Sequence, residues 1–255
     1  MTLDSRVASA LLRGPSDAVV TGVTALHLHG VEVGEALPVR LVTATHAQTR
    51  RAGVRLVRAK RLPARTHHLA APLAAWLAAG AELDLVDLVA AGDALLRLKH
   101  GTLEELQAAA AEATGRGCLT VRRAGTLVRE RVDSVPESRL RLCLVLAGLP
   151  EPRCNVTLGH GGRIIGRVDL LFEEYGVICE YDGDQHRDRG QWNLDLDRDD
   201  DSSDAGFRTV RVTRDRMRRP REVVRRVYAR LVEAGYEGPA PAFDAEWCAL
   251  FADRV

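Results

Sequence analysis

The chain has 255 residues, of which 46% are hydrophobic and 28% are charged, and its 36 basic and 35 acidic side chains leave a formal net charge of +1. This composition is that of a globular protein and excludes a disordered or collagen-like chain. No apolar run approaches the roughly 20 residues that a membrane helix needs, and the N-terminus lacks the pattern of a secretory signal, so we expect a cytoplasmic protein without a membrane partner.

The first part of the chain, residues 1–132, has the pattern of a small α+β domain. Apolar residues recur at i, i+3 and i+4 in its Ala- and Leu-rich stretches, which indicates helices. Shorter runs rich in Val alternate with polar residues, which is typical of strands. The predicted elements are a helix over 20–31, strands over 39–46 and 53–62, and helices within 69–98 and over 102–115.

The second part, residues 133–255, begins with a clear helix start. Ser134 and Glu137 have the spacing of a capping box, and a proline stands within the first helical turn. The pattern then predicts the order α-β-β-β-α-β-α. The elements after the first helix are strands over 154–158, 163–172 and 177–183, a helix over 190–205, a strand over 207–213 and a helix over 220–234.

Carboxylates interrupt the apolar pattern of two neighbouring predicted strands. A turn centred on residues 174–175 would place Asp169 opposite Glu180 and Arg167 opposite Asp182. Opposed residues share a face, with Cβ atoms about 4.5–5.5 Å apart. Since side chains alternate along a strand, Glu180 and Asp182 also share a face. The spacing therefore predicts three carboxylates on one small surface.

Carboxylates this close raise one another's pKa unless a cation lies between them. A divalent metal ion resolves the conflict, and hard oxygen ligands suit Mg²⁺ or Mn²⁺. Such an ion activates water and stabilises charge on a phosphoryl group, which is what hydrolysis of a phosphodiester requires.

The predicted element order, with Glu137, Asp169 and Glu180 at its acidic positions, resembles the PD-(D/E)XK nuclease superfamily. The motifs P-E-S-R-L-R, R-V-D, E-Y-D-G-x-x-H and R-D…A-G-F-R-T-V-R, within residues 134–232, more closely resemble an uncharacterised bacterial domain related to the very-short-patch-repair (Vsr) endonuclease. The region before residue 133 resembles the AbiEi antitoxin family. The resemblance implies a restriction-endonuclease-like αβββαβ core with a mixed central sheet, preceded by a small α+β N-terminal domain.

The resemblance also implies the metal ligands. Asp169 would be the principal ligand of Mg²⁺ or Mn²⁺. Glu180 would be the second, helped by its own backbone carbonyl or by that of Tyr181, and Glu137 would reach the metal through water. Glu137 also has a purely structural explanation, because the capping box alone accounts for it.

The chain departs from the superfamily at the lysine that follows the second acid by two residues, where Asp182 stands instead. His186 is then the candidate that orients or deprotonates the attacking water, because imidazole titrates near neutrality. Asp182 is equally explained as the start of a turn before a glycine, and His186 as a solvated loop residue.

Charge is distributed unevenly along the second part. Residues 180–204 hold ten carboxylates and three arginines, a balance of −7, and residues 206–230 hold ten arginines and two carboxylates, a balance of +8. The basic block fits a nucleic-acid surface, or it neutralises the acidic block before it. The predicted nucleic-acid-binding residues are Arg167, Arg198, Arg211 and Arg214.

Other sites receive no support. No His or Cys group has the spacing of a zinc site, and the five cysteines contain no C-x-x-C pair, which favours reduced thiols. The opposed carboxylates predict a metal-dependent nuclease, and the resemblance implies a DNA endonuclease that acts in DNA repair or in defence against phages and mobile elements. The alternative is a catalytically inactive nuclease fold that binds DNA or acts as an antitoxin-like regulator.

Overall fold

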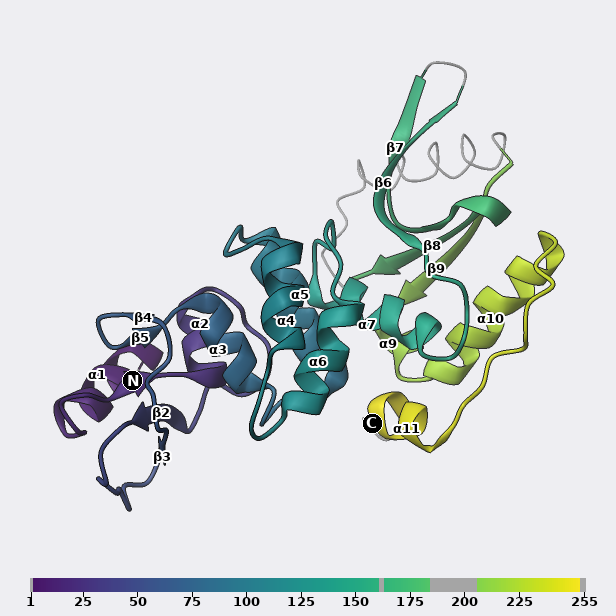
Figure 1. Cartoon of the computed structure of the whole chain (residues 1–255). Helices are drawn as coiled ribbons and strands as arrows, with labels where there is room; N and C mark the ends of the chain where they lie inside the picture. The colour runs from purple at the N-terminus through teal and green to yellow at the C-terminus, as the bar shows by residue number, and fades with distance from the viewer. Residues whose placement is uncertain (1, 161–162, 184–205, 253–255) are drawn as a thin grey trace. The chain divides into compact units, whose positions relative to one another are not determined.

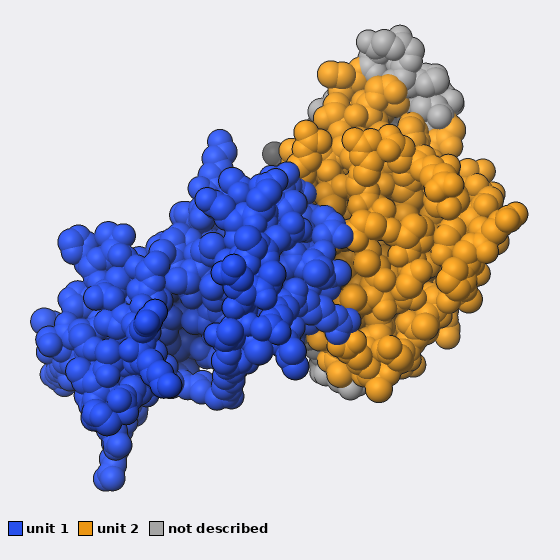
Figure 2. Space-filling view, viewed as in Figure 1, with its two compact units in different colours: residues 1–130 blue, residues 131–255 orange. Residues whose placement is uncertain are grey.

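The computed structural model describes residues 2–160, 163–183 and 206–252. These residues form a mixed α/β protein with two mixed sheets (Figure 1). The chain divides into two compact units, unit 1 over residues 1–130 and unit 2 over residues 131–255 (Figure 2). Across the described ranges, no helix has the length and apolar character needed to cross a bilayer. The helix predicted over 190–205 lies outside the described residues.

Unit 1 contains a sheet in the order β3-β2-β1-β5-β4, flanked by helices. The two longer strands predicted from the sequence are β2 and β3, and they pair in parallel although only a short segment joins them. The elements are α1 Leu3–Leu12, β1 Val19–Val20, α2 Gly22–Leu28, β2 Val39–Thr43, β3 Val54–Arg58, β4 Arg65–Thr66, β5 Leu69–Ala70, α3 Pro72–Ala79, α4 Leu85–Arg97, α5 Leu103–Ala111 and α6 Cys118–Leu127.

Helix packing in unit 1 follows from small residues and defined caps. Trp76 of α3 is fully buried and donates from its indole nitrogen to the carbonyl of Leu88 in α4 at 2.8 Å. A Cβ atom on Gly125 of α6 would lie 2.5 Å from the Cβ of Ala110 in α5, so only glycine permits this approach. Thr102 and Glu105 form a capping box at the start of α5.

Unit 2 contains a sheet in the order β6-β7-β8-β9, in which the first two pairings are antiparallel and the last is parallel. The four strands predicted for this part are all present. The elements are α7 Val135–Val145, β6 Arg153–His160, β7 Arg163–Phe172, a 3₁₀ turn η1 Glu173–Tyr175, β8 Val177–Asp182, β9 Arg208–Thr213, α9 Arg214–Met217, α10 Pro220–Glu233, α11 Ala245–Trp247 and a π-helical turn η2 Cys248–Ala252.

Apolar side chains cover both faces of β8, as its uninterrupted Val-Ile-Cys start predicts. Val177, Ile178 and Cys179 are at most 1% exposed. Helices α7 and α10 both pack against β8. Ile178 belongs to a buried cluster that is completed by Leu158, Val168 and Leu171.

The predicted register of the β7–β8 hairpin is confirmed where the strands pair. Leu170 lies opposite Cys179 and Phe172 opposite Val177, with the turn at residues 173–176. The ladder comprises three residue pairs and ends at Leu170 and Cys179. Beyond that point β7 leaves β8 and continues with β6 as a two-stranded hairpin (Figure 1). We call this point of divergence, marked by Asp169 on β7 and Glu180 on β8, the fork.

The C-terminal segment is anchored to unit 2 by Trp247. Its side chain is 1% exposed and donates from the indole nitrogen to the carbonyl of Cys143 in α7 at 3.0 Å. The rings of Phe243 and Phe251 lie 4.7 and 5.2 Å from it, centroid to centroid. Trp247 therefore ties the end of the chain to the helix that underlies the sheet.

Removing the indole should destabilise unit 2. We expect Trp247→Ala to lower the free energy of unfolding by about 3–5 kcal/mol, because it deletes a buried aromatic side chain and leaves a cavity. Trp247→Phe, which keeps an aromatic ring, should cost less than Trp247→Ala. Urea unfolding followed by circular dichroism measures both, and a wild-type midpoint for Trp247→Ala would contradict the anchoring role.

Candidate functional site

The site predicted from the sequence lies at the fork. Asp169 is half-buried there, and its Oδ2 accepts a hydrogen bond from the backbone N–H of Tyr181 at 2.8 Å. A side-chain oxygen thus binds a backbone N–H of β8 just past the end of the β7–β8 ladder. Within the described part of the chain, no group donates a hydrogen bond to the other oxygen, Oδ1.

Polar residues from four adjacent strands meet at the fork. The pairs Cys154–Leu170 and Val156–Val168 of β6 and β7 place Asn155 opposite Asp169. Glu180 of β8 is the direct partner of Arg211 in β9. Asp169 and Glu180 interact electrostatically across the gap between β7 and β8. The sheet therefore presents Asn155, Asp169, Glu180 and Arg211 as a transverse row.

The environment of Asp169 favours its protonated form. Burial raises the pKa of this carboxyl to about 6, and the negative charges of Glu137 and Glu180 act in the same direction. The Tyr181 N–H and the charge of Arg167 oppose the shift without cancelling it. A carboxyl near two other carboxylates and partly removed from water is the arrangement that a cation would stabilise.

Glu137 has a structural role at the start of α7, and its charge also acts on Asp169. It is 9% exposed in the first turn of α7, and its backbone N–H donates to the hydroxyl of Ser134 at 3.3 Å, so the predicted helix start is confirmed. The carboxylate accepts from the Ser134 hydroxyl at 2.7 Å, from the Asp133 N–H at 3.0 Å and from the Asn155 amide at 2.8 Å. These bonds hold Glu137 in place while its charge acts on Asp169.

Glu180 is paired with a cation. Its Oε2 lies 3.8 Å from Nε of Arg211, and the two side chains are 21% and 29% exposed. Arg211, predicted as a nucleic-acid contact, therefore lies beside a predicted metal ligand. Asp182 is half-buried at the last β8–β9 pair, opposite Thr213.

The three-carboxylate cluster expected from the spacing is not formed. Across residues 2–160, 163–183 and 206–252, no three His, Cys, Asp or Glu side chains gather into a group that would hold a metal ion. The β7–β8 ladder also ends before the predicted pair of Arg167 with Asp182, so that pair is not part of it. Arg167 instead lies opposite Thr157 of β6 and pairs with Asp133 at 2.5 Å.

Two carboxylates still fit the requirements of a hard cation. Mg²⁺ usually takes one or two protein carboxylates and completes its shell with water and phosphate oxygens. Asp169, with its Oδ1 and its raised pKa, and Glu180 supply that number of ligands. The roles predicted for the backbone carbonyl of Tyr181 and for Glu137 through water stay predictions.

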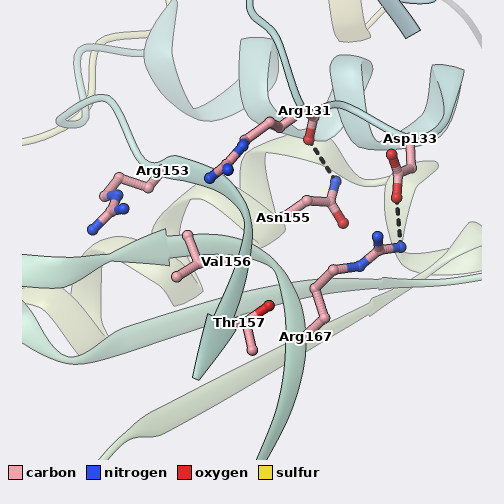
Figure 3. A pocket seen from close by; sticks show the side chains of 7 residues that line it. All are labelled: Arg131, Asp133, Arg153, Asn155, Val156, Thr157 and Arg167. Atoms are coloured by element: carbon pink, nitrogen blue, oxygen red, sulfur yellow. Dashed lines mark hydrogen bonds and ion pairs between the residues drawn. The ribbon is translucent and has the colours of Figure 1, made fainter. Parts of the chain in front are cut away.

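A pocket of about 450 Å³ lies in unit 2 at the β6–β7 side of this row (Figure 3). We call it the arginine pocket, because three guanidinium groups from separate segments line it. Figure 3 shows Arg131 and Arg153 on one side of it and Arg167 with Asp133 on the other. Its lining residues are Arg131, Asp133, Arg153, Asn155, Val156, Thr157 and Arg167.

Only Arg167 of this pocket was predicted. Asn155 and Thr157 lie two residues apart on β6, and Asn155 lies opposite Asp169 of β7. A predicted register for the β6–β7 pair would therefore have pointed to Asn155. Of the other predicted residues, Arg214 is the exposed first residue of α9. His186 and Arg198 lie outside the described residues.

The comparisons with known proteins identify no family. No family model matches the chain, and no solved structure matches it. The chain is similar to two curated proteins of Mycobacterium tuberculosis, Uncharacterized protein MT2308 (strain CDC 1551) and Uncharacterized protein Rv2248 (strain H37Rv). Each is 31% identical over 110 residues, which cover 39% of this chain and 40% of the relative. The chain therefore spans less than half the length of these relatives.

The raised pKa of Asp169 predicts a pH-dependent loss of stability. The protonated Asp169 carboxyl contributes fully to the free energy of unfolding below the ordinary carboxyl pKa of 3.8. This contribution is lost as the pH rises through about 6, because the folded state binds the proton more tightly than the unfolded state. Asp169→Asn, which cannot ionise, should escape this loss. Relative to wild type, we expect it to gain on the order of 2 kcal/mol in unfolding free energy between pH 4.5 and 7.5.

Urea unfolding in EDTA at the two pH values measures this difference without interference from metal ions. Asp215→Asn is the matched control, since the Asp215 side chain is 87% exposed. If the difference between Asp169→Asn and wild type is the same at both pH values, the electrostatic description of the fork is wrong.

Proposed function

We propose that the protein is a metal-dependent endonuclease that cleaves or nicks DNA by hydrolysis of a phosphodiester bond, in DNA repair or in defence against phages and mobile elements. The observation that carries the proposal is the fork, where Asp169 and Glu180 face each other across the gap between two strands. An apolar sheet has no structural need for two interacting carboxylates at its centre.

The topology of unit 2 also supports the proposal. Among the described residues, helix α7, the antiparallel strands β6 to β8 and the parallel strand β9 come in an order compatible with a restriction-endonuclease-like core, whose helix between β8 and β9 would fall outside those residues. We propose that unit 2 has this core. The carboxylates then lie on the second and third strands, where the superfamily carries its metal ligands.

In this proposal Asp169 and Glu180 hold Mg²⁺ or Mn²⁺. The bound ion would supply an activated water and neutralise charge on the phosphoryl group. The Tyr181 N–H orients the Asp169 carboxylate, and Arg211 orients that of Glu180. Arg167, on the same strand as Asp169 and 59% exposed, is placed to contact a DNA phosphate.

A second function is favoured by a different observation. The superfamily lysine is replaced by Asp182, and the described residues contain no three-ligand group. A nuclease fold that binds DNA without cleaving it, or acts as an antitoxin-like regulator, would need the arginines but not the metal. It predicts binding that is sensitive to salt and indifferent to Mg²⁺ and to Asp169→Ala.

Cleavage assays separate the two functions. Purified wild-type protein is incubated with nicked, mismatched, single-stranded and branched DNA in Mg²⁺ or Mn²⁺. We expect cleavage that falls on the order of 100-fold or more in Asp169→Ala and Glu180→Ala, because each substitution removes a metal ligand. Glu174→Ala is the matched control, since Glu174 is exposed in the turn of the same hairpin.

Cleavage that survives in both Asp169→Ala and Glu180→Ala would contradict the assignment of the fork as the active site. DNA binding without cleavage by the wild type, unchanged by metal, would establish the second function. Calorimetric titration with Mn²⁺ gives an independent readout, with heat of binding expected for wild type and lost in Asp169→Ala.

A further inference from the structure

The proposed metal ligands, Asp169 and Glu180, do not account for the arginine pocket. Its three guanidinium groups reach it from different parts of unit 2: Arg131 precedes α7, Arg153 begins β6 and Arg167 lies within β7. Figure 3 shows the guanidinium groups of Arg131 and Arg153 on one side of the pocket and that of Arg167 directed toward Asp133 on the other. Like charges that line one hollow repel one another, which has an electrostatic cost. An anion in the pocket would offset that cost.

The carboxylates near the pocket do not balance its charge. Asp133 pairs with Arg167, and Glu173, outside the pocket lining, pairs with Arg153 at 2.6 Å through side chains that are both more than half exposed. Such exposed pairs are weak and exchange readily with another anion. In the part of the chain that the structure describes, no carboxylate pairs with the guanidinium of Arg131.

The backbone of the pocket is held in an unusual conformation. Arg131 and Asn155 have φ angles of +61° and +46°, and they are two of the four non-glycine residues with positive φ in the described ranges. The Asn155 amide donates to the Arg131 carbonyl at 2.8 Å (Figure 3). Left-handed backbone at non-glycine residues costs energy and concentrates at ligand sites. Here the left-handed backbone at Arg131 and Asn155, with the hydrogen bond between them, joins the segment before α7 to β6 at the pocket.

We propose that the arginine pocket binds a phosphate monoester at the end of a nucleic-acid strand. A monoester carries a charge of about −1.5 to −2 at pH 7 and three acceptor oxygens, which suits several guanidinium groups at once. A phosphodiester within a continuous strand has a single charge. The pocket volume of about 450 Å³ admits a phosphate with its attached nucleoside.

The pocket and the fork share one residue. Asn155 lines the pocket, lies opposite Asp169 and donates to Glu137. A terminal phosphate in the pocket would therefore place the adjoining part of the strand beside the fork. This step rests on the proposed function, and it assigns the enzyme a substrate with a phosphorylated end, such as a nicked or broken strand.

Fluorescence anisotropy tests the pocket without any catalysis. The probes are labelled single-stranded 12-mers that carry a 5′-phosphate, a 3′-phosphate or no terminal phosphate, and the full chain is titrated in EDTA. We expect at least one phosphorylated probe to bind about tenfold more tightly than the unphosphorylated one. Inorganic phosphate should compete for this added affinity, and the two phosphorylated probes distinguish which end is recognised.

The variants assign the preference to the pocket. Arg131→Gln and Arg153→Gln should abolish the preference, and Arg131→Lys should retain part of it, because it keeps the charge and loses the planar fork of donors. Arg218→Gln is the matched control, since Arg218 is exposed and lies outside the pocket. Circular dichroism verifies that each variant is folded.

Equal affinity for all three probes would overturn the proposal. So would a preference that survives in both Gln variants, or an equal loss of affinity for phosphorylated and unphosphorylated probes, which would indicate internal phosphodiesters. Because no metal is present, a protein that fails to cleave DNA can still pass this test. A protein that cleaves DNA without the preference keeps its proposed function and loses this site.

Discussion

The hydrogen bond from the Tyr181 N–H to the Asp169 carboxylate is the interaction on which the proposed site in unit 2 depends. It is formed where the backbone ladder of β7 and β8 has ended, so it joins two strands that are parting. The β7–β8 ladder ends at Leu170 and Cys179, and the carboxylates of Asp169 and Glu180 lie directly beyond that point. The Asp169 carboxyl is partly buried at the gap between the two strands, and among residues 2–160, 163–183 and 206–252 no group donates a hydrogen bond to its Oδ1.

Hydrogen bonds from Asn155 join the start of α7 to the arginine pocket beside this gap. Asn155 connects them, since it faces Asp169, donates to Glu137 and holds the backbone of Arg131. Glu137 therefore accepts hydrogen bonds at the start of α7, which Ser134 caps, and its charge raises the pKa of Asp169. Asn155 thus lies between the proposed metal ligand Asp169 and the proposed phosphate site, which is why we treat them as parts of one surface.

The strands and helices of unit 2 were predictable because their signals are local. The capping residue Ser134 begins α7, the run from Val177 to Cys179 marks a strand covered on both faces, and the turn before Gly176 sets the register in which Leu170 meets Cys179. The candidate site was only partly predictable. Asp169 and Glu180 interact at the fork, but no group of three carboxylates that would hold a metal ion forms among the described residues. The sequence could not distinguish these outcomes, because a ladder that continues and one that diverges have the same alternating pattern.

The sequence by itself determined which residues are available for chemistry: carboxylates within apolar strands, and opposite charge concentrated in neighbouring blocks. It could do so because burial makes an ionisable side chain costly, so its presence in such a strand is informative. Only the tertiary structure decided which of these groups meet. Because β7 diverges from β8, Arg167 is not opposite Asp182 in the ladder, and it pairs with Asp133. Residues from three separate segments line the arginine pocket, where Asn155 and Arg131 have left-handed backbone. Contacts between distant segments depend on the direction that whole strands take in the fold, and no local sequence pattern predicts that direction.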